Sequence, residues 1–331
     1  MEDKLKGKAK KFHIGKFITD WAAVITVVIL LVFFSISMPE IFPTSSNITT
    51  ILRSISITTV IAMGLTLTLS VGGFDLSAGS TATMASFFMM SFIIWYDMNM
   101  WLALLLTVVG TLAITLVNMF LIVKCKIPDL LATVAAMFFL EGLCLTYSGG
   151  GAISAGMPRP DGQPSLGGVP QAFKVLGTSP TIIIIMLVLV LIVHIFLKYT
   201  KYGRYIYAVG GNRIAAKLSG IPVKKYRIIA GVMAGVCIAI GGILVASRNQ
   251  SAQINGANSF QMPALAAVFI GRSVAGQSKP NAIGTLIGAT LVGILDNGLI
   301  MMRVPYYSLN AIKGIVLALA LASTYYSAKE D

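Results

Sequence analysis

The stretch VGGFDLSAGS, residues 71–80, places three glycines and one aspartate between two strongly apolar segments. ITTVIAMGLTLTLS precedes it and TATMASFFMMSFIIW follows it, so both flanking segments suit hydrocarbon better than water. Glycine lets the backbone leave helical geometry, which is tolerated at membrane depth only where the backbone faces protein or a polar cavity. The stretch therefore predicts two membrane helices joined by a short non-helical segment inside the protein.

The composition of the whole chain agrees with a membrane location. Charged residues make up 11% of the 331 residues, against roughly 25% in ordinary soluble domains. Hydrophobic residues make up 56%, and the mean hydropathy is +0.85. We interpret the chain as an all-α polytopic membrane protein. The net charge of +13 then reflects basic cytoplasmic loops, and a nucleic-acid partner is not expected.

The hydrophobic runs predict about ten transmembrane helices of the length that a bilayer core requires. Most of the 25 Lys and Arg residues fall in the tail and loops on one side, so the positive-inside rule puts both termini in the cytoplasm. Residues 1–20 and 327–331 are then cytoplasmic tails, and 21–326 form a single transmembrane domain. The expected spans are about 21–38, 51–71, 80–96, 101–123, 127–147, 181–197, 228–247, 261–271, 281–302 and 306–326.

A weak internal repeat suggests that this domain has two halves of opposite orientation. The tripeptide Gly-Thr-Leu occurs at 110–112 and at 284–286, and a hydrophobic-Pro step follows each copy, at 127–128 and 304–305. The first copy lies in a span that runs inward and the second in a span that runs outward. Inverted repeats of this kind are common in transporters, and here they relate spans 2–5 to spans 7–10.

The longest cytoplasmic loop, residues 198–227, contains a short amphipathic helix. It carries basic residues and no acid. Asn212 can cap a helix that Gly220 ends, and an apolar stripe recurs at helical spacing between them. Such a helix either docks into a partner, which small side chains at 215 and 216 would let approach closely, or lies on anionic lipid. The residues expected to contact the partner are Asn212, Arg213, Ile214, Ala215, Ala216, Leu218, Ser219 and Gly220.

Three segments, GGFDLSAGS, AVGGNRIAAKLSGI and GTLIGATLVGILDNGL, resemble signature segments of the ribose-type (monosaccharide) ABC transporter permeases, in the same order. The resemblance covers about residues 51–322. It implies a dimeric permease core built with a second copy or a paralogue, in the cytoplasmic membrane of a prokaryote. It also implies an ABC ATPase subunit, which binds the ATP, and an extracytoplasmic sugar-binding protein. The chain itself would bind no cofactor and would do no chemistry on its cargo.

The chain departs from the family pattern at several places, and these departures leave the cargo open. Phe74 stands where Ile or Val is usual, and Asp296 where a second Asn is common; 148–180, an expected extracytoplasmic loop, is rich in Gly and Pro. A ribose-, xylose- or galactose-like monosaccharide is the first expectation. The alternatives are a nucleoside, a furanosyl autoinducer or a branched-chain amino acid. An ion-coupled secondary transporter and a membrane-embedded enzyme are alternatives to the class itself.

The opening stretch has two interpretations, which do not exclude each other. Asp75 and Ser77 supply acceptors that can cap the third span, or the broken backbone and Asp75 line and gate a translocation path. No catalytic or metal-ligating pattern is present. The residues expected along the path are Gly72, Gly73, Phe74, Asp75, Leu76, Ser77, Asn118, Asp296, Asn297 and Lys313.

Charged and polar groups inside the other spans need partners, since an unpaired charge in hydrocarbon is costly. Asp296 and Lys313 have matching depths in adjacent spans, and we expect them to form an ion pair. Glu141 could pair with Arg53 or Lys313. Asn118 in the fourth span is expected to form an interhelical hydrogen bond.

Overall fold

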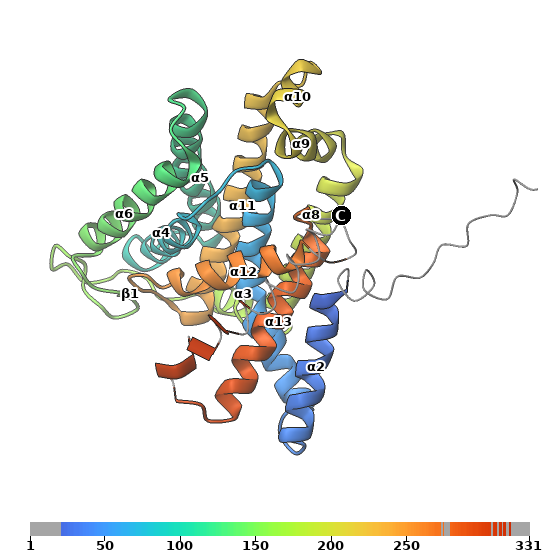
Figure 1. Cartoon of the computed structure of the whole chain (residues 1–331). Coiled ribbons are helices and arrows are strands. Elements are labelled where there is room, and N and C mark those ends of the chain that lie inside the picture. The colour runs from blue at the N-terminus through green and yellow to red at the C-terminus, as the bar shows by residue number, and fades with distance from the viewer. Residues whose placement is uncertain are drawn as a thin grey trace, which may run out of the picture.

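The computed structural model describes residues 21–272, 274, 279–305, 307–309, 311–312, 314–315 and 318, and within them the chain is a bundle of helices (Figure 1). The first half contains α2 (Ala22–Ser37), α3 (Ser45–Ser70), α4 (Ala78–Met90), the π-helical turn η1 (Ser91–Trp95), α5 (Met100–Met119), the π-helical turn η2 (Phe120–Lys124) and α6 (Asp129–Ser148). The rest contains β1 (Ile153–Ser154), α7 (Gln171–Leu176), α8 (Thr181–Tyr199), α9 (Lys201–Gly211), α10 (Arg213–Leu218), α11 (Val223–Asn249), β2 (Ser251–Ala252), the 3₁₀ turn η3 (Asn258–Phe260), α12 (Gln261–Gly271) and α13 (Ala282–Met301).

The helices α3 and α11 lie side by side at the centre of the bundle, and α4 crosses them at a steep angle (Figure 1). We compare the buried share of the most apolar stretch of each span. This share is 89% for Ala78–Trp95 and 22% for α6. Large side chains such as Phe138 and Phe139 of α6 are exposed on the outside. Because a soluble protein would bury such a surface, α5, α6 and α8 have the composition of helices that face lipid.

The expected spans from 21–38 to 281–302 each coincide with a helix. Seven of the described helices are long and apolar enough to cross a membrane. The expected eighth span, 261–271, coincides with α12, whose 11 residues are too few for a helix to cross the hydrocarbon alone. At 1.5 Å per residue it is about 16 Å long, roughly half the hydrocarbon thickness. The expected span 306–326 falls largely outside the described residues.

The expected extracytoplasmic loop, 148–180, is folded against the bundle and adds a small sheet to the all-helical expectation. Strands β1 and β2 pair antiparallel, with Ile153 opposite Ala252. The backbone N–H groups of Leu166 and Gly167 donate to the carbonyl of Ile94 at 3.1 and 2.9 Å. The loop is therefore attached to η1, which follows α4, and through β2 to the residues after α11.

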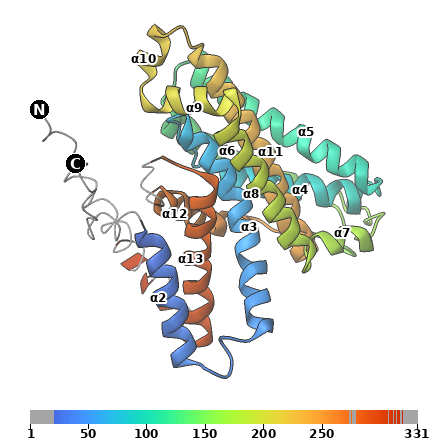
Figure 2. The same cartoon turned by 90° about the vertical axis from the view of Figure 1, so that its right-hand side faces the viewer.

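The expected cytoplasmic loop, 198–227, contains α9 and α10, which cap one end of the bundle in both views (Figures 1 and 2). In Figure 2, α7 and the lower end of α2 lie away from this end. The side chains of Ile206 and Val209 of α9 belong to the main hydrophobic core. This packing fixes the position of α9, and α10 follows it after a single residue.

The glycine pair of the opening stretch ends α3 in a Schellman motif. The Gly73 N–H donates to the Thr68 carbonyl at 2.9 Å and the Gly72 N–H to the Leu69 carbonyl at 3.1 Å. The motif requires a left-handed residue after the cap, and Gly72 has φ +71°. At Gly73 a Cβ would lie 3.0 Å from the Asp129 carboxylate. Both positions thus require glycine, one for its backbone conformation and the other for space.

We predict that Gly72→Ala destabilises the protein by about 1–2 kcal/mol, because an L-residue at positive φ places its Cβ against the following carbonyl. Gly142→Ala is the matched control, since its Cβ would meet nothing within 4 Å in the middle of α6. Replacing a helix-interior glycine by alanine should leave stability unchanged or raise it. Thermal unfolding of the purified variants in detergent measures both. Equal melting temperatures for Gly72→Ala and the wild type would contradict the requirement for glycine at position 72.

Candidate functional site

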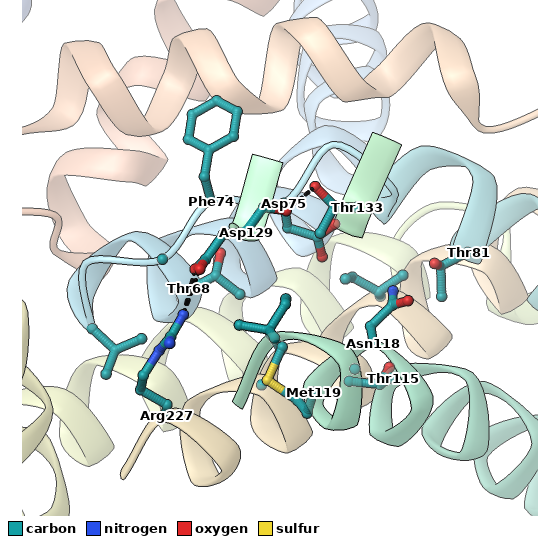
Figure 3. A pocket seen from close by; sticks show the side chains of 17 residues that line it. Thr68, Phe74, Asp75, Thr81, Thr115, Asn118, Met119, Asp129, Thr133 and Arg227 are labelled. Atoms are coloured by element: carbon teal, nitrogen blue, oxygen red, sulfur yellow. Dashed lines mark hydrogen bonds and ion pairs between the residues drawn. The ribbon is translucent and has the colours of Figure 1, made fainter. Parts of the chain in front are cut away.

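A pocket with both apolar and polar groups in its wall lies between α3, the non-helical residues 71–77 (the broken segment), α5, α6 and α11 (Figure 3). The enclosed space is about 30 Å³, room for a water or two and far below the volume of an open small-molecule site, so the pocket is closed in this structure. Most of the polar groups are neutral and can both donate and accept hydrogen bonds. The polar lining residues are Thr68, Asp75, Thr81, Thr115, Asn118, Asp129, Thr133 and Arg227.

The Asp75 carboxylate shapes the broken segment from inside. Its Oδ1 accepts hydrogen bonds from the backbone N–H and the hydroxyl of Ser77, both at 2.7 Å. The Leu76 N–H donates to the Thr133 hydroxyl at 3.2 Å, and the Asn118 amide donates to the Ser77 hydroxyl at 3.2 Å. Asp75 thus supplies an acceptor just before α4. The expected capping role is wrong for Ser77, whose side chain makes no capping hydrogen bond.

The first turn of α4 is instead satisfied by Gln261, the first residue of α12. Its Oε1 accepts from the Gly79 N–H at 2.6 Å, and its Nε2 donates to the Asp75 carbonyl at 3.1 Å. The Gln261 side chain is buried, so water cannot replace these bonds. Two short helices therefore begin beside each other within the bundle. The sequence pattern did not single out Gln261, which lies 182 residues from Gly79.

Glu141 of α6 bonds to neutral groups beside this junction. Its Oε1 accepts from the Asn258 amide at 2.8 Å and from the Ser80 hydroxyl at 3.4 Å. These partners replace Arg53, which the sequence suggested, while Lys313 lies outside the described residues. The reason is that α12 begins inside the bundle, which brings Asn258 next to α6. Among the described residues, no group of three or more His, Cys, Asp or Glu side chains could hold a metal ion.

An ion pair closes one end of the pocket. Arg227 at the start of α11 lies 2.6 Å from Asp129 at the start of α6, and their side chains are 13% and 18% exposed. Figure 3 places this pair at one end and Thr81 and Thr115 toward the other. Breaking a buried pair by removing one partner typically costs about 3–5 kcal/mol. Sequence reasoning counted Arg227 among the loop charges and missed Asp129, although an acid in a first helical turn is a recognisable signal.

The structure brings part of the expected path to this pocket. Residue 72 and residues 76–77 belong to the same broken segment but are not among the lining residues. Asn118 lines the pocket, and its hydrogen bond goes to Ser77 of the broken segment rather than to another helix. The expected path residues that line the pocket are Gly73, Phe74, Asp75 and Asn118.

Two other expected path residues, Asp296 and Asn297, lie elsewhere. They are on α13, which packs against α2, α3 and α12, and they do not line this pocket. The expected ion pair between Asp296 and Lys313 remains a prediction, because Lys313 is outside the described residues.

The short helix α10 has the ends that the sequence predicts. The Asn212 Oδ1 accepts from the Ile214 and Ala215 N–H groups, both at 3.0 Å, which confirms the N-cap. Gly220, with φ +78°, follows the last turn, and the Gly220 N–H donates to the Lys217 carbonyl at 3.1 Å. The helix is therefore fixed at both ends by local hydrogen bonds.

The apolar side chains of α10 divide between the solvent and the protein. Ile214 is 74% exposed and Leu218 is 84% exposed, whereas Ala216 is 5% exposed. The expectation that Ala216 permits close approach of a partner is therefore wrong, because its methyl group packs against the chain's own core. Large apolar side chains that stay exposed on a structured element often mark an interaction surface.

Comparison with known proteins gives one family and several full-length relatives. Residues 47–321 match the family described as "Branched-chain amino acid transport system / permease component". The chain is 32% identical to the ribose import permease protein of Haemophilus influenzae, covering 98% of this chain and 99% of that protein. It is 30% identical to the ribose import permease protein of Bacillus subtilis, over 96% and 97%. It is 26% identical to the xylose transport system permease protein of Haemophilus influenzae, over 90% and 93%.

We predict that Asp75→Asn keeps the fold, because the amide oxygen can still accept both hydrogen bonds from Ser77. Asp75→Ala is the matched variant that removes the acceptor, and it should cost about 1–3 kcal/mol. Thermal unfolding in detergent separates the two. If the charge of Asp75 also acts in transport, Asp75→Asn will lower cargo uptake at unchanged stability. Normal uptake by Asp75→Asn would reduce the role of this carboxylate to holding the turn.

Proposed function

The chain belongs to the permease family that the branched-chain amino acid transport systems typify, and on this premise we propose that it is the membrane-spanning subunit of an ABC importer for a monosaccharide. The observation that carries the proposal is the 32% identity to a ribose import permease over 98% of the chain. The departures at Phe74 and Asp296 do not interrupt this similarity, which runs through both positions.

The chemistry of the pocket supports a neutral, polyhydroxylated cargo. A sugar hydroxyl can both donate and accept, as can the threonine hydroxyls and the Asn118 amide on the pocket wall. The two charged side chains at the inner end, Asp129 and Arg227, already neutralise each other. The lining therefore suits a neutral cargo of ribose, xylose or galactose type better than an anion, which the Asp75 carboxylate in the wall would repel.

The membrane arrangement follows from the basic end of the bundle. We place α9 and α10 in the cytoplasm, with about ten crossings and both chain termini on the same side, in a prokaryotic cytoplasmic membrane. The short helix α12 then enters from the outer side and starts at the middle of the bundle, where it meets the start of α4. This meeting of two helix starts, one from each half, supports the inverted relation between spans 2–5 and 7–10.

The partners in this proposal each have a place on the molecule. The ATPase subunit, which binds the ATP, would receive the exposed side chains of α10, while the chain itself holds no cofactor and carries out no chemistry. The binding protein would dock on the opposite end, where the 148–180 loop lies. A second permease copy or a paralogue and the membrane lipid would cover the lipid-facing helices.

The test of the cargo uses the permease purified together with its cognate ATPase and binding protein. Ribose, xylose, galactose, adenosine and leucine are compared as stabilisers of the binding protein and as cargo in proteoliposomes. We expect one monosaccharide to stabilise the binding protein by about 2.7 kcal/mol at a concentration of 100 Kd, and its uptake to require ATP.

Two outcomes of this test would contradict the proposal. Stabilisation by leucine or adenosine alone would assign the transporter to another cargo. Uptake that continues with an ATPase variant unable to hydrolyse ATP, and that follows an ion gradient, would place the chain among secondary transporters.

We predict that Ile214→Asp combined with Leu218→Asp abolishes binding of the ATPase subunit. Each exposed apolar side chain should contribute about 1.5–3 kcal/mol when buried in a partner, so losing two should weaken association by well over tenfold. Leu166→Asp is the control, since Leu166 is also exposed but lies in the loop at the opposite end. Pull-down of the ATPase from detergent measures the effect. Full binding of the ATPase by the double variant would contradict docking through α10 and favour the alternative, in which α10 lies on the lipid surface.

A further inference from the structure

The segment that contains α10 touches the broken segment through its backbone, with no layer of side chains between them. A Cβ on Gly72 would lie 3.3 Å from the Gly210 Cα, and a Cβ on Gly210 would overlap the Ser70 carbonyl. Tyr207 of α9 donates to the Pro280 carbonyl at 2.8 Å, and the Ser70 hydroxyl donates to the same carbonyl at 3.4 Å. Since close-packed backbones cannot absorb a shift by changing side-chain rotamers, a displacement of α9 and α10 must be passed on.

Arg213, the first residue of α10, makes the direct bond between the two segments. Its guanidinium donates to the carbonyl of Gly72, the left-handed residue of the Schellman motif. Hydrogen bonds from an ionised donor are roughly twice as strong as those between neutral groups. Asn212 fixes the backbone at the start of α10, so the position of the Arg213 side chain is tied to the position of the helix.

Gly73, the residue after Gly72, lies against the Asp129–Arg227 ion pair at the end of the pocket. A Cβ at Gly73 would lie 3.0 Å from the Asp129 Oδ2, and Asp129 is held by Arg227 at 2.6 Å. Partial burial of the Arg213 guanidinium lowers its pKa, and the charge of Arg227 lowers this pKa further, while Asp129 opposes both effects. Two guanidinium groups therefore share the field of one carboxylate, on either side of the glycine pair.

We propose that Arg213 is a positioning residue that couples movement of α10 to the inner end of the pocket, through the Gly72 carbonyl and the Asp129–Arg227 ion pair. The inference rests on the proposed function. When the ATPase pulls α10 outward, the Gly72–Gly73 turn moves with Arg213 and withdraws from Asp129. The ion pair then loses the wall that holds it, and the inner end of the pocket opens. Repulsion between the guanidinium groups of Arg213 and Arg227 lowers the stability of the closed arrangement, so the protein can convert to the open one.

The first experiment compares Arg213→Gln, Arg213→Lys and the wild type in proteoliposomes with the ATPase and the binding protein. Lys225→Gln is the matched control, because Lys225 is another exposed basic residue nearby, at the start of α11. We expect Arg213→Gln to keep ATPase binding and ATP hydrolysis but to move at least tenfold less sugar per ATP. Arg213→Lys should restore part of the sugar moved per ATP, and Lys225→Gln should move as much sugar per ATP as the wild type.

The second experiment measures the coupling between α10 and residues 72–77 directly, without a transport assay. Hydrogen–deuterium exchange is measured with and without a non-hydrolysable ATP analogue in the assembled complex. In the wild type, the analogue should change exchange at residues 72–77 and in α10. In Arg213→Gln, the change in α10 should remain and the change at 72–77 should disappear.

The ion pair is tested by exchanging its charges. Asp129→Arg and Arg227→Asp should each lower the sugar moved per ATP, and the double variant should recover most of it, since the pair is then restored in reverse. If a single variant does not fold, the double variant still decides, because a folded double variant with wild-type exchange changes at 72–77 retains the linkage. A folded double variant that lacks those changes would overturn the role of the pair.

Other outcomes are equally decisive. Wild-type sugar transport per ATP by Arg213→Gln, or an unchanged exchange response at 72–77, would overturn the linkage while leaving the proposed function intact. Loss of ATPase binding by Arg213→Gln would make Arg213 a docking contact instead. If the wild-type complex neither transports a sugar nor hydrolyses ATP, the proposed function itself fails.

Discussion

A helix broken inside a membrane leaves backbone N–H and C=O groups that hydrocarbon cannot satisfy, and each must find a partner within the protein. In this chain the break between α3 and α4 is the place where that requirement is most severe. The Schellman motif satisfies the end of α3, and the Asp75 carboxylate and Thr133 satisfy the segment that follows. Gln261 satisfies the start of α4 and the Asp75 carbonyl together. These partners come from α6 and α12, so the break determines which helices must stand next to it.

The same requirement explains why polar residues gather in one region of an otherwise apolar bundle. Thr133 and Asn118 contact the broken segment and also line the pocket. A side chain that satisfies the backbone has further donors or acceptors available, and some of these face the empty space. The pocket is thus a consequence of interrupting α3 and α4, and a surface suited to hydroxyl groups arises from residues that are needed for folding.

The parts of the fold that depend on local pattern could be predicted from the sequence. Apolar length located the helices, and Asn212 and Gly220 located the ends of α10. The hydropathy predicts a span from about residue 51, whereas α3 begins at Ser45, because the first turns of the helix are polar. The glycine pair was correctly read as a break, although the reason, a left-handed cap at Gly72, is visible only in the structure.

Apart from the hydrogen bonds between Asp75 and Ser77, the contacts that build the site could not be predicted, because they join residues that are far apart in the chain. Gln261 meets Gly79 across 182 positions, and Arg227 meets Asp129 across 98. No periodicity links such pairs, and a buried glutamine looks the same in the sequence as an exposed one. For Glu141 the sequence did suggest a partner, but the suggested partner was wrong. Charge alone suggested a basic partner, whereas the short length of α12 brings the neutral Asn258 to it.

The central helix α11 has a mechanical consequence because both of its ends are held. At its C-terminal end, the Ser247 hydroxyl donates to the Phe173 carbonyl of α7, and the chain continues directly into β2. Near its N-terminal end, Arg227 holds Asp129. The two residues are about 30 Å apart along a helix without a break, so a tilt of about 5° displaces one end by about 3 Å relative to the other. α11 therefore acts as a lever: a load on the 148–180 loop reaches the Asp129–Arg227 pair along the same helix that forms one wall of the pocket.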